Sequence, residues 1–295
     1  MAPQVSFSFA TLNVRGLASK KKQSQVYRLL LEENLDVLAV QETKVEGEEE
    51  TGSMVLKFTS RYFATVSQAI GTSGGCVLFV RKLPGLVIEN VFSCSSGRVV
   101  WCDIVYCDTE WRIICVYAPT IGQERSGFFS NLRQHMCNGR KLLLVGDFNC
   151  VLNESDRSSR RNVKDRSSDV LAQVIIEHEL VDVAECLHSS RDVKYTHFQG
   201  TSNARLDRLY LTADAISQCS SYNVVPVSFS DHCLIECNIG SKKERNAFSW
   251  EQWKMNSNLL RDESFSASVI KEISNINIEC MDKIGEEWEL FKQRI

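Results

Sequence analysis

The sequence predicts a mixed α/β domain in which two β-sheets pack face to face with helices on the outside. Three observations support this prediction. The chain begins with a strand, helix, strand pattern, it continues with four β-rich runs between residues 61 and 117, and helical patterns then alternate with further strands up to about residue 240. Hairpin-like runs of this kind build antiparallel or mixed sheets, so a purely parallel sheet is not expected.

The expected elements follow from apolar periodicity. The N-terminal unit has strands at residues 6–14 and 36–41, joined by an amphipathic helix at residues 21–33. The β-rich runs are residues 62–67, 76–81, 99–106 and 111–117, separated by the Gly74-Gly75 pair and a polar turn at residues 107–110. Later strands are expected at residues 141–145, 206–211, 222–229 and 234–239, with helices at residues 125–137 and 168–179.

Near Gly240 the chain becomes polar, at residues 241–246, and the pattern that follows is helical. Apolar residues recur at three- and four-residue steps from Val269 to Ile295, which is typical of an amphipathic helix that packs against another surface. We therefore expect one domain at residues 1–240 and a helical linker or tail at residues 241–295, which leads toward a further domain or drives self-association.

Composition limits the classes of function. With 43% apolar and 24% charged residues in 295, the chain fits one large domain plus an appendage. No apolar run reaches membrane-spanning length and no signal peptide pattern is present, so a soluble intracellular protein without a membrane partner is expected. The twelve cysteines include no Cys-x-x-Cys pair, and most stand in apolar stretches, so we expect them to be free thiols in the core. Free thiols in turn indicate a reducing compartment. Because the net charge is −3, any contact with DNA must be local.

Three polar strings stand where apolar runs stop: Gln41-Glu42-Thr43, Gly146-Asp147-Phe148-Asn149 and Ser230-Asp231-His232. Each follows a run that reads as a buried strand. Since ligands collect beyond strand ends, on loops that a rigid sheet holds, we expect the three strings to converge. An acid, an Asp/Asn pair and an Asp-His pair are the groups that metal-assisted phosphodiester hydrolysis requires.

Each group also has a simpler interpretation. Glu42 suits a Mg²⁺ ligand, yet a solvated glutamate at a strand end would look the same. Asp147 and Asn149, two apart on an extended segment, point the same way and could activate water and hold a phosphate oxygen or the metal. The alternative is an Asx turn that ends the strand. His232 could stabilise charge on a phosphate if a carboxylate fixes its ring, and Asp207, from another strand, is the natural candidate.

The best candidate surface for a DNA backbone is a basic segment downstream of Asp147. Its cations are Arg157, Arg160, Arg161, Lys164 and Arg166. Interleaved aspartates at positions 156, 165 and 169 leave a solvated loop as an equally good interpretation.

Together, these groups occur in the order of a known family. The matching strings are Leu12-Asn13-Val14-Arg15-Gly16-Leu17, Gln41-Glu42-Thr43-Lys44, Val116-Tyr117-Ala118-Pro119, Gly146-Asp147-Phe148-Asn149, Arg205-Leu206-Asp207-Arg208 and Ser230-Asp231-His232. Over about residues 5–240 the chain resembles the endonuclease/exonuclease/phosphatase superfamily, which includes exonuclease III-like enzymes, apurinic endonucleases and neutral phosphodiesterases. The resemblance implies a four-layered α/β sandwich of the exonuclease III and DNase I type. It also implies one divalent cation at the sheet ends, Mg²⁺, with Mn²⁺ as a substitute.

The resemblance also implies roles for individual residues. Glu42 would bind the metal, with Asn13 nearby and Asp231 on the metal side. The catalytic set would contain Tyr117 on the phosphate, Asp147 positioning the nucleophilic water, Asn149 assisting it, and Asp207 orienting His232. Phosphate or DNA contacts are expected from Lys44, Thr196, Arg157, Arg160 and Arg161.

Within the superfamily, the chain looks most like the endonuclease at the start of a long interspersed (non-LTR) retrotransposon. Residues 41–44, the 156–159 loop and the tail strings at 253–256 and 288–292 carry this likeness. It implies nicking of chromosomal DNA in the nucleus, with reverse transcriptase and RNA as partners in trans. Three positions depart from the family pattern: Arg15 stands where repair members carry Asp, Thr120 where Asn is common, and Ala204 where retroelement nucleases often have Ser.

Other functions stay open at this point. A repair-type apurinic endonuclease or 3′ exonuclease would carry the same strings, and a phosphatase of lipid head groups is further removed. A non-enzymatic fragment that binds DNA or partners through its tail is the alternative from a different class.

Overall fold

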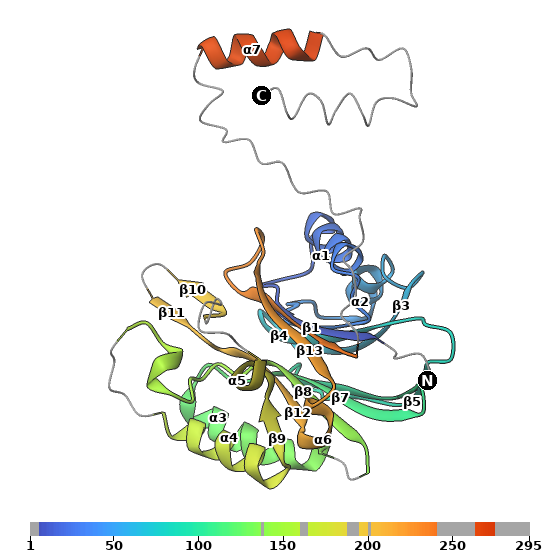
Figure 1. The fold of residues 1–295 in the computed structure, drawn as a ribbon, viewed down its shortest axis with the longest axis vertical. Coiled ribbons are helices and arrows are strands. Elements are labelled where there is room, and N and C mark those ends of the chain that lie inside the picture. Colours follow the sequence, from blue (N-terminus) through green and yellow to red (C-terminus); the bar gives the residue numbers. More distant parts are fainter. Residues whose placement is uncertain are drawn as a thin grey trace. The chain divides into compact units, whose positions relative to one another are not determined.

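The computed structural model describes residues 6–136, 139–159, 165–187, 195–199, 202–240 and 263–274. The chain divides into two compact units, Met1–Asn246 and Ala247–Ile295. The first unit contains two six-stranded mixed sheets (Figure 1). From the second unit, the helix α7 (Glu263–Ser274) is described, and Ile270 and Ile273 are exposed on it. The part of the predicted apolar stripe that follows α7 lies outside the described residues, so the tail's role stays a prediction.

The first sheet has the strand order β13-β14-β1-β2-β4-β3. Its strands are β1 (Phe7–Asn13), β2 (Val37–Gln41), β3 (Tyr62–Ile70), β4 (Ser73–Arg81), β13 (Cys219–Pro226) and β14 (Cys233–Ile239). β1 and β2 are parallel because α1 (Lys20–Glu32) carries the chain back between them, and the other neighbours are antiparallel. A second outer helix, α2 (Glu48–Val55), follows β2.

The second sheet has the order β5-β6-β7-β8-β12-β9. Its strands are β5 (Val87–Ser93), β6 (Val99–Tyr106), β7 (Thr109–Tyr117), β8 (Lys141–Asp147), β9 (Leu180–Asp182) and β12 (Asp207–Thr212). β7 and β8 are parallel and are joined through α3 (Gly122–Leu132) and a 3-10 turn η1 (Arg133–His135). The other elements are η2 (Glu154–Asp156), α4 (Arg166–Glu177), α5 (Val183–Leu187), α6 (Ala213–Ile216) and the hairpin β10 (His197–Gln199) with β11 (Ser202–Ala204).

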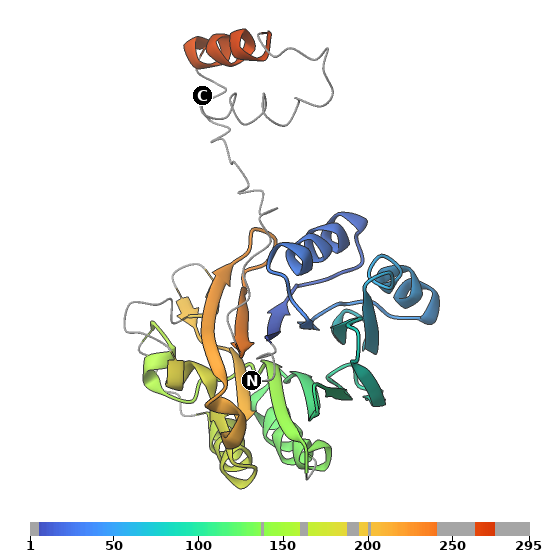
Figure 2. The same ribbon diagram turned by 45° about the vertical axis from the view of Figure 1, so that its right-hand side comes forward.

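Helices and sheets form four layers, which confirms the predicted fold class. A central core lies between the sheets and includes Phe9, Ala39, Cys115 and Val145. α1 and α2 cover the outer face of the first sheet, and α3 and α4 cover that of the second, as both views show (Figures 1 and 2). Central strands such as β2 and β8 are buried on both faces, which explains the apolar runs at residues 37–40 and 142–145.

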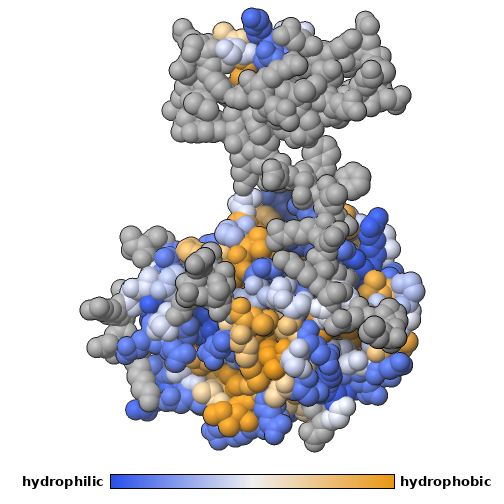
Figure 3. Space-filling model, viewed as in Figure 1, coloured by the Kyte–Doolittle hydropathy of each residue, from blue (hydrophilic) through white to orange (hydrophobic). Residues whose placement is uncertain are grey.

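The edge strand β13 closes one side of the core between the sheets. Apolar side chains gather on the surface over β13, α5 and α6 (Figure 3), where Leu187, Ile216, Cys219 and Val224 are partly buried against the central core. Among the described residues, no helix is long and apolar enough to cross a membrane.

Some expected elements differ from the structure. β5 and α2 were not expected, because β5 is an exposed edge strand without regular alternation and the apolar face of α2 is narrow. Gly74 and Gly75 lie inside β4, and the β3–β4 turn is instead at Gly71 and Thr72, since Ile70 pairs with Ser73.

The third polar string, Ser230 to His232, does not follow a strand directly. β13 ends at Pro226, and the string lies at the start of β14. Because β14 runs antiparallel to β1, its start lies beside the end of β1. The string therefore reaches the same end of the sandwich as the other two.

Candidate active site

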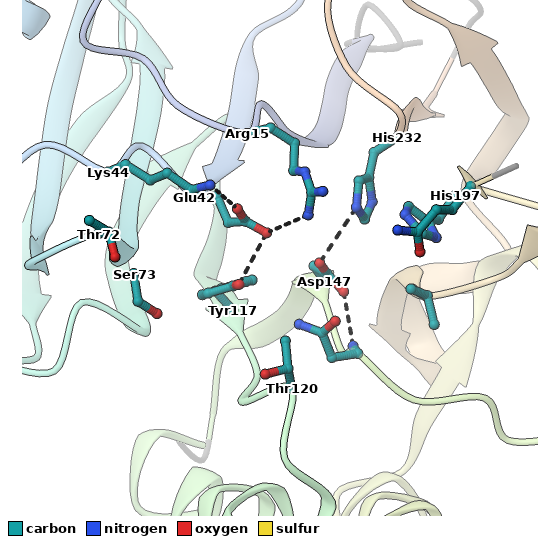
Figure 4. A pocket seen from close by; sticks show the side chains of 13 residues that line it. Arg15, Glu42, Lys44, Thr72, Ser73, Tyr117, Thr120, Asp147, His197 and His232 are labelled. Carbon is teal, nitrogen blue, oxygen red and sulfur yellow. Dashed lines mark hydrogen bonds and ion pairs between the residues drawn. The ribbon is translucent and has the colours of Figure 1, made fainter.

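A polar pocket of about 370 Å³ lies at one end of the two sheets, where β1, β2, β7 and β8 end and β4, β12 and β14 begin (Figure 4). Both sheets contribute to it. Its lining consists of Arg15, Glu42, Lys44, Thr72, Ser73, Tyr117, Thr120, Asp147, Asn149, His197, Gln199, Leu206 and His232. The three polar strings thus converge, as expected from their positions at strand ends.

Glu42, directly after β2, is a buried carboxylate surrounded by donors. Its Oε1 accepts hydrogen bonds from Asn13 Nδ2 at 2.9 Å and from the Tyr117 hydroxyl at 3.1 Å. Lys44 Nζ lies 3.0 Å from Oε2, and an Arg15 guanidinium nitrogen lies 3.6 Å from Oε1. Burial alone would raise the pKa of Glu42, but these hydrogen bonds and positive charges outweigh it and lower the pKa. Glu42 is therefore ionised at neutral pH.

Asp147 ends β8 and is almost completely buried. Its Oδ2 accepts a hydrogen bond from Asn13 Nδ2 at 2.9 Å, so the Asn13 amide bridges Glu42 and Asp147. Burial, together with the negative charge of Asp207, raises the pKa of Asp147 well above its usual range. A carboxylate with a raised pKa is suited to accept a proton.

His232 is fixed by a carboxylate from another strand. Its Nδ1 lies 2.8 Å from Asp207 Oδ2, the oxygen that also accepts a hydrogen bond from the Thr196 hydroxyl at 2.7 Å. Its Nε2 faces Asp147 Oδ2 at 4.0 Å. Burial lowers the pKa of His232, but the charge and hydrogen bond of Asp207 outweigh burial and raise the pKa to about 9. The imidazole is therefore positively charged at neutral pH.

Asn149 adopts a left-handed backbone conformation, with φ of 50°. Its backbone N–H donates to Asp147 Oδ1 at 2.9 Å, and its side-chain amide donates to the Ala118 carbonyl at 2.8 Å. The Asx turn that the sequence left as the alternative is thus formed. β8 ends at Asp147, so the two side chains do not extend from one continuous strand, although both line the pocket.

Two ionisable residues of the pocket lining, Arg15 and His197, were not among the predicted site residues. Arg15 reaches Asp231 Oδ2 at 3.2 Å in addition to Glu42. The His197 ring packs at a tilt of 45° against the His232 ring, with centroids 4.5 Å apart, and its Nε2 lies 3.5 Å from Asp231 Oδ2. Burial and then the charge of His232 lower the pKa of His197. Arg15 was noticed only as a departure from the family pattern, and no sequence signal marked His197.

The predicted DNA contacts lie in different environments. Lys44 lines the pocket, whereas Arg157 lies outside it and forms an isolated bridge with Ala204. Arg160 and Arg161 lie outside the described residues. Thr196 is fully buried, and its hydroxyl donates to Asp207 Oδ2, so in this structure it supports that carboxylate.

A buried ion-pair network supports the second sheet behind the pocket. The fully buried Arg208 donates to Asp156 Oδ2 at 2.7 Å and to Asp182 Oδ2 at 3.2 Å. Arg205 also donates to Asp182 and lies 3.7 Å from Asp156. The network ties β12, which begins with Asp207, to η2 and β9.

The donor set fits a hard divalent cation. The ionised Glu42 lines the pocket, and the carboxylates of Asp147 and Asp207 lie close to one another beside His232. Carboxylate oxygens are the groups that Mg²⁺ prefers, usually one or two of them together with water and substrate.

A two-sheet sandwich with these acidic and imidazole groups at one end has the architecture of a phosphodiesterase. Residues 10–232 match the Endonuclease/Exonuclease/phosphatase family, and the chain belongs to that family. The resemblance stated from the sequence is therefore confirmed. Members of this family are generally metal-dependent hydrolases.

A relative encoded by a transposon is similar over most of this chain. Over 274 residues the chain is 29% identical to the transposon TX1 uncharacterized 149 kDa protein of Xenopus laevis, and the match covers 90% of this chain. The chain spans about 20% of that relative's length. The likeness to a transposon-encoded protein is confirmed.

Solved structures share the fold. An AP endonuclease of Leishmania major superposes with a TM-score of 0.69 at 17% identity, covering 80% of this chain and 88% of that one. The 3′-5′ exonuclease NExo of Neisseria meningitidis gives a TM-score of 0.65 at 18% identity, covering 79% and 99%. An AP endonuclease of Archaeoglobus fulgidus gives 0.62 at 19% identity, covering 78% and 98%.

Proposed function

We propose that this chain is a Mg²⁺-dependent DNA endonuclease that nicks a phosphodiester by in-line attack of water, with Mn²⁺ as a substitute metal. One observation carries the proposal: the buried Asp147 lies between the Asn13 amide, which links it to Glu42, and the charged His232, held by Asp207. A base, an electrophile and a metal-binding carboxylate thus face one pocket. The similarity to a transposon protein favours a nicking role, as in target-primed retrotransposition.

Glu42 is the residue that the geometry favours for holding the metal. Asn13 turns its NH₂ group toward both carboxylates, and Asp231 is paired with Arg15, so their roles as ligands are weaker proposals. When bound, the cation supplies Lewis-acid polarisation of the phosphate and neutralises its charge.

Residues of this chain accept and donate the protons of the reaction. Asp147, whose pKa is raised by burial, accepts the proton of the attacking water. His232, with a pKa of about 9, stays protonated and stabilises negative charge that develops on the phosphate oxygens. Burial raises the pKa of the Tyr117 hydroxyl, which therefore stays a proton donor toward Glu42 or the phosphate. Asn149 supports the turn that positions Asp147.

The pocket carries cations suited to a polyanion. Arg15 and Lys44, whose side chains are 43% and 37% exposed, lie on the Glu42 side. Under this proposal the partner is DNA, a reverse transcriptase and RNA act in trans, and the nucleus is the place of action. The helical tail at residues 241–295 would mediate attachment or self-association.

A repair-type apurinic endonuclease is the second candidate, and the fold shared with two AP endonucleases favours it. Substrate preference separates the two functions. Nicking of intact duplex DNA supports the first, whereas cleavage confined to abasic sites or free 3′ ends supports the second.

The test is conversion of supercoiled plasmid to open circle with Mg²⁺, with and without EDTA. Asp147→Asn is expected to reduce nicking by about 10² to 10⁴-fold, because it removes the base. Asp108→Asn, the same change at an exposed turn, is the matched control and is expected to stay active. Full nicking by Asp147→Asn, or nicking that EDTA does not affect, would contradict the mechanism. A folded wild type that cleaves neither plasmid nor abasic DNA would be a binding fragment.

A further inference from the structure

Two cysteine sulfurs lie in contact at the edge of the first sheet. Cys219 begins β13, Cys237 lies in the neighbouring strand β14, and their Sγ atoms are 3.6 Å apart. Cys219 pairs with Ile239, two residues beyond Cys237, and the register shifts between Cys219 and Ser221. Because a disulfide joins sulfurs at about 2.05 Å, rotation of the two side chains brings them to bonding distance while the strands stay paired.

The two thiols differ in their access to solvent. Cys219 is partly exposed within the apolar surface over β13, α5 and α6 (Figure 3), whereas Cys237 is fully buried. A reagent in solution therefore meets Cys219 first, and Cys237 stands behind it. Cys76 and Cys115 also contact each other, but both are fully buried in the central core between the sheets.

The contact between the sulfurs also makes their acidities unequal. The Cys237 thiol donates a hydrogen bond to the Cys219 sulfur, and this bond lowers the pKa of Cys219 against the effect of burial. The same contact, together with burial, raises the pKa of Cys237. Since the thiolate is the form that attacks an oxidant, the accessible Cys219 is the more reactive of the two.

We propose that Cys219 and Cys237 form an oxidisable dithiol, which hydrogen peroxide converts into a disulfide between β13 and β14. First, the Cys219 sulfur attacks one peroxide oxygen, the O–O bond breaks, and Cys219 sulfenic acid and one water form. The Cys237 sulfur then attacks the Cys219 sulfur, and the S–O bond breaks. The hydroxyl leaves with the Cys237 proton as a second water. The two thiols thus lose two electrons and two protons, and the peroxide is reduced to two waters.

This modification site is separate from the candidate active site. The segment between β13 and β14 carries Asp231 and His232, whereas Cys219 and Cys237 lie toward the other end of these strands. The dithiol can therefore be tested whether or not the chain cleaves DNA.

The experiment treats the folded full chain with hydrogen peroxide, blocks the remaining thiols with N-ethylmaleimide, and identifies joined peptides by mass spectrometry without reduction. The main cross-link is expected to join Cys219 to Cys237 and to be separated by dithiothreitol. In urea, where the strands no longer hold the two sulfurs together, the preference for this pair is expected to be lost.

Three variants assign the steps. Cys219→Ser removes the attacking sulfur, so the cross-link is expected to disappear and Cys237 to remain a thiol. Cys237→Ser is expected to leave Cys219 as sulfenic acid, which dimedone traps in larger amount than in the wild type. Cys107→Ser, the same change at an exposed turn, is the matched control and should form the cross-link as the wild type does.

The folded wild type and the surface variant Cys219→Ser decide the question even if Cys237→Ser, which changes a buried residue, fails to fold. A folded wild type that forms no Cys219–Cys237 pair, or that joins Cys219 to Cys186 instead, would overturn the proposal. The same conclusion would follow if urea left the preference for the pair unchanged.

Discussion

Replacing Asp207 by asparagine removes the charge that holds His232 while keeping the shape of the side chain. Asp207 Oδ2 is 2.8 Å from His232 Nδ1 and also accepts the Thr196 hydroxyl. Both contacts are buried, so water cannot replace the lost carboxylate. The substitution therefore tests the electrostatics of the pair more than its packing.

The expected magnitude follows from the pKa of His232. In the wild type this pKa rises from 6.5 to about 9, although burial acts in the opposite direction. The charge and hydrogen bond of Asp207 are the largest contributions that raise it, ahead of Asp147 and Asp231. In Asp207→Asn the pKa is expected to fall toward 6.5, which corresponds to about 3 kcal/mol of interaction with the protonated ring.

The same shift predicts how stability depends on pH. Since the pKa is higher in the folded than in the unfolded chain, the proton's contribution to the free energy of unfolding is complete below about pH 6.5. It is lost as pH rises through the folded value of about 9. With EDTA present, the wild type is expected to lose up to about 3 kcal/mol across this window, and Asp207→Asn much less.

Two measurements check this prediction. The ring-proton NMR signals of the five histidines are followed against pH, with His232 assigned by its loss in His232→Gln. Urea unfolding at pH 6.5 and pH 9 gives the stability change, and Asp108→Asn serves as control. A His232 pKa that is equal in wild type and Asp207→Asn, or equal pH slopes of their stabilities, would refute the reasoning.

Two further substitutions test the framework around the site. Arg208→Met leaves the buried Asp156 carboxylate without its 2.7 Å partner and should cost about 3–5 kcal/mol, seen as a lower urea midpoint; a cost below about 1 kcal/mol would contradict the network's role. Gly146→Ala would place a methyl group 2.0 Å from the Val116 carbonyl oxygen, so a fall of several degrees in melting temperature is expected. Gly127→Ala, in α3 with open space around it, should instead raise the melting temperature slightly; equal effects of the two changes would argue against the clash.

The sequence predicted the central strands well because both of their faces are covered. β2 and β8 lie between a layer of helices and the opposite sheet, so residues 37–40 and 142–145 within them are all apolar. β5 lacks this signal, because it is an edge strand whose exposed Glu89 and Asn90 interrupt any alternation. A strand buried on both faces can thus be recognised from its apolar sequence. An edge strand cannot, because it is defined by its hydrogen bonds to a neighbouring strand.

The candidate site was predictable only in part for a related reason. Glu42 and Asp147 stand beside apolar runs that mark strand ends, and Asp207 was expected beside His232 from its place at the start of another strand. Arg15 also follows a predicted strand, at residues 6–14, but nothing in the sequence indicates that it lies beside two acids. Its position between two acids depends on loops that are far apart in the sequence and meet only in the folded chain.

The backbone conformation at the pocket could not be predicted from the sequence either. Of the eight non-glycine residues with positive φ in the described part of the chain, four line the pocket: Arg15, Glu42, Lys44 and Asn149. Left-handed backbone costs such residues roughly 1–2 kcal/mol each, so residue type alone does not indicate it. Strained residues of this kind are known to cluster at functional sites, where the surrounding structure holds them.

Here the surrounding structure is a ladder of backbone hydrogen bonds that continues beyond the strands. Gly16 and Leu17 donate to the carbonyls of Glu42 and Thr43, both at 2.7 Å, and Lys44 N–H donates to the Gly74 carbonyl at 3.1 Å. Because these bonds involve only the backbone, replacing the side chain at position 15 changes charge in the pocket without releasing the loop.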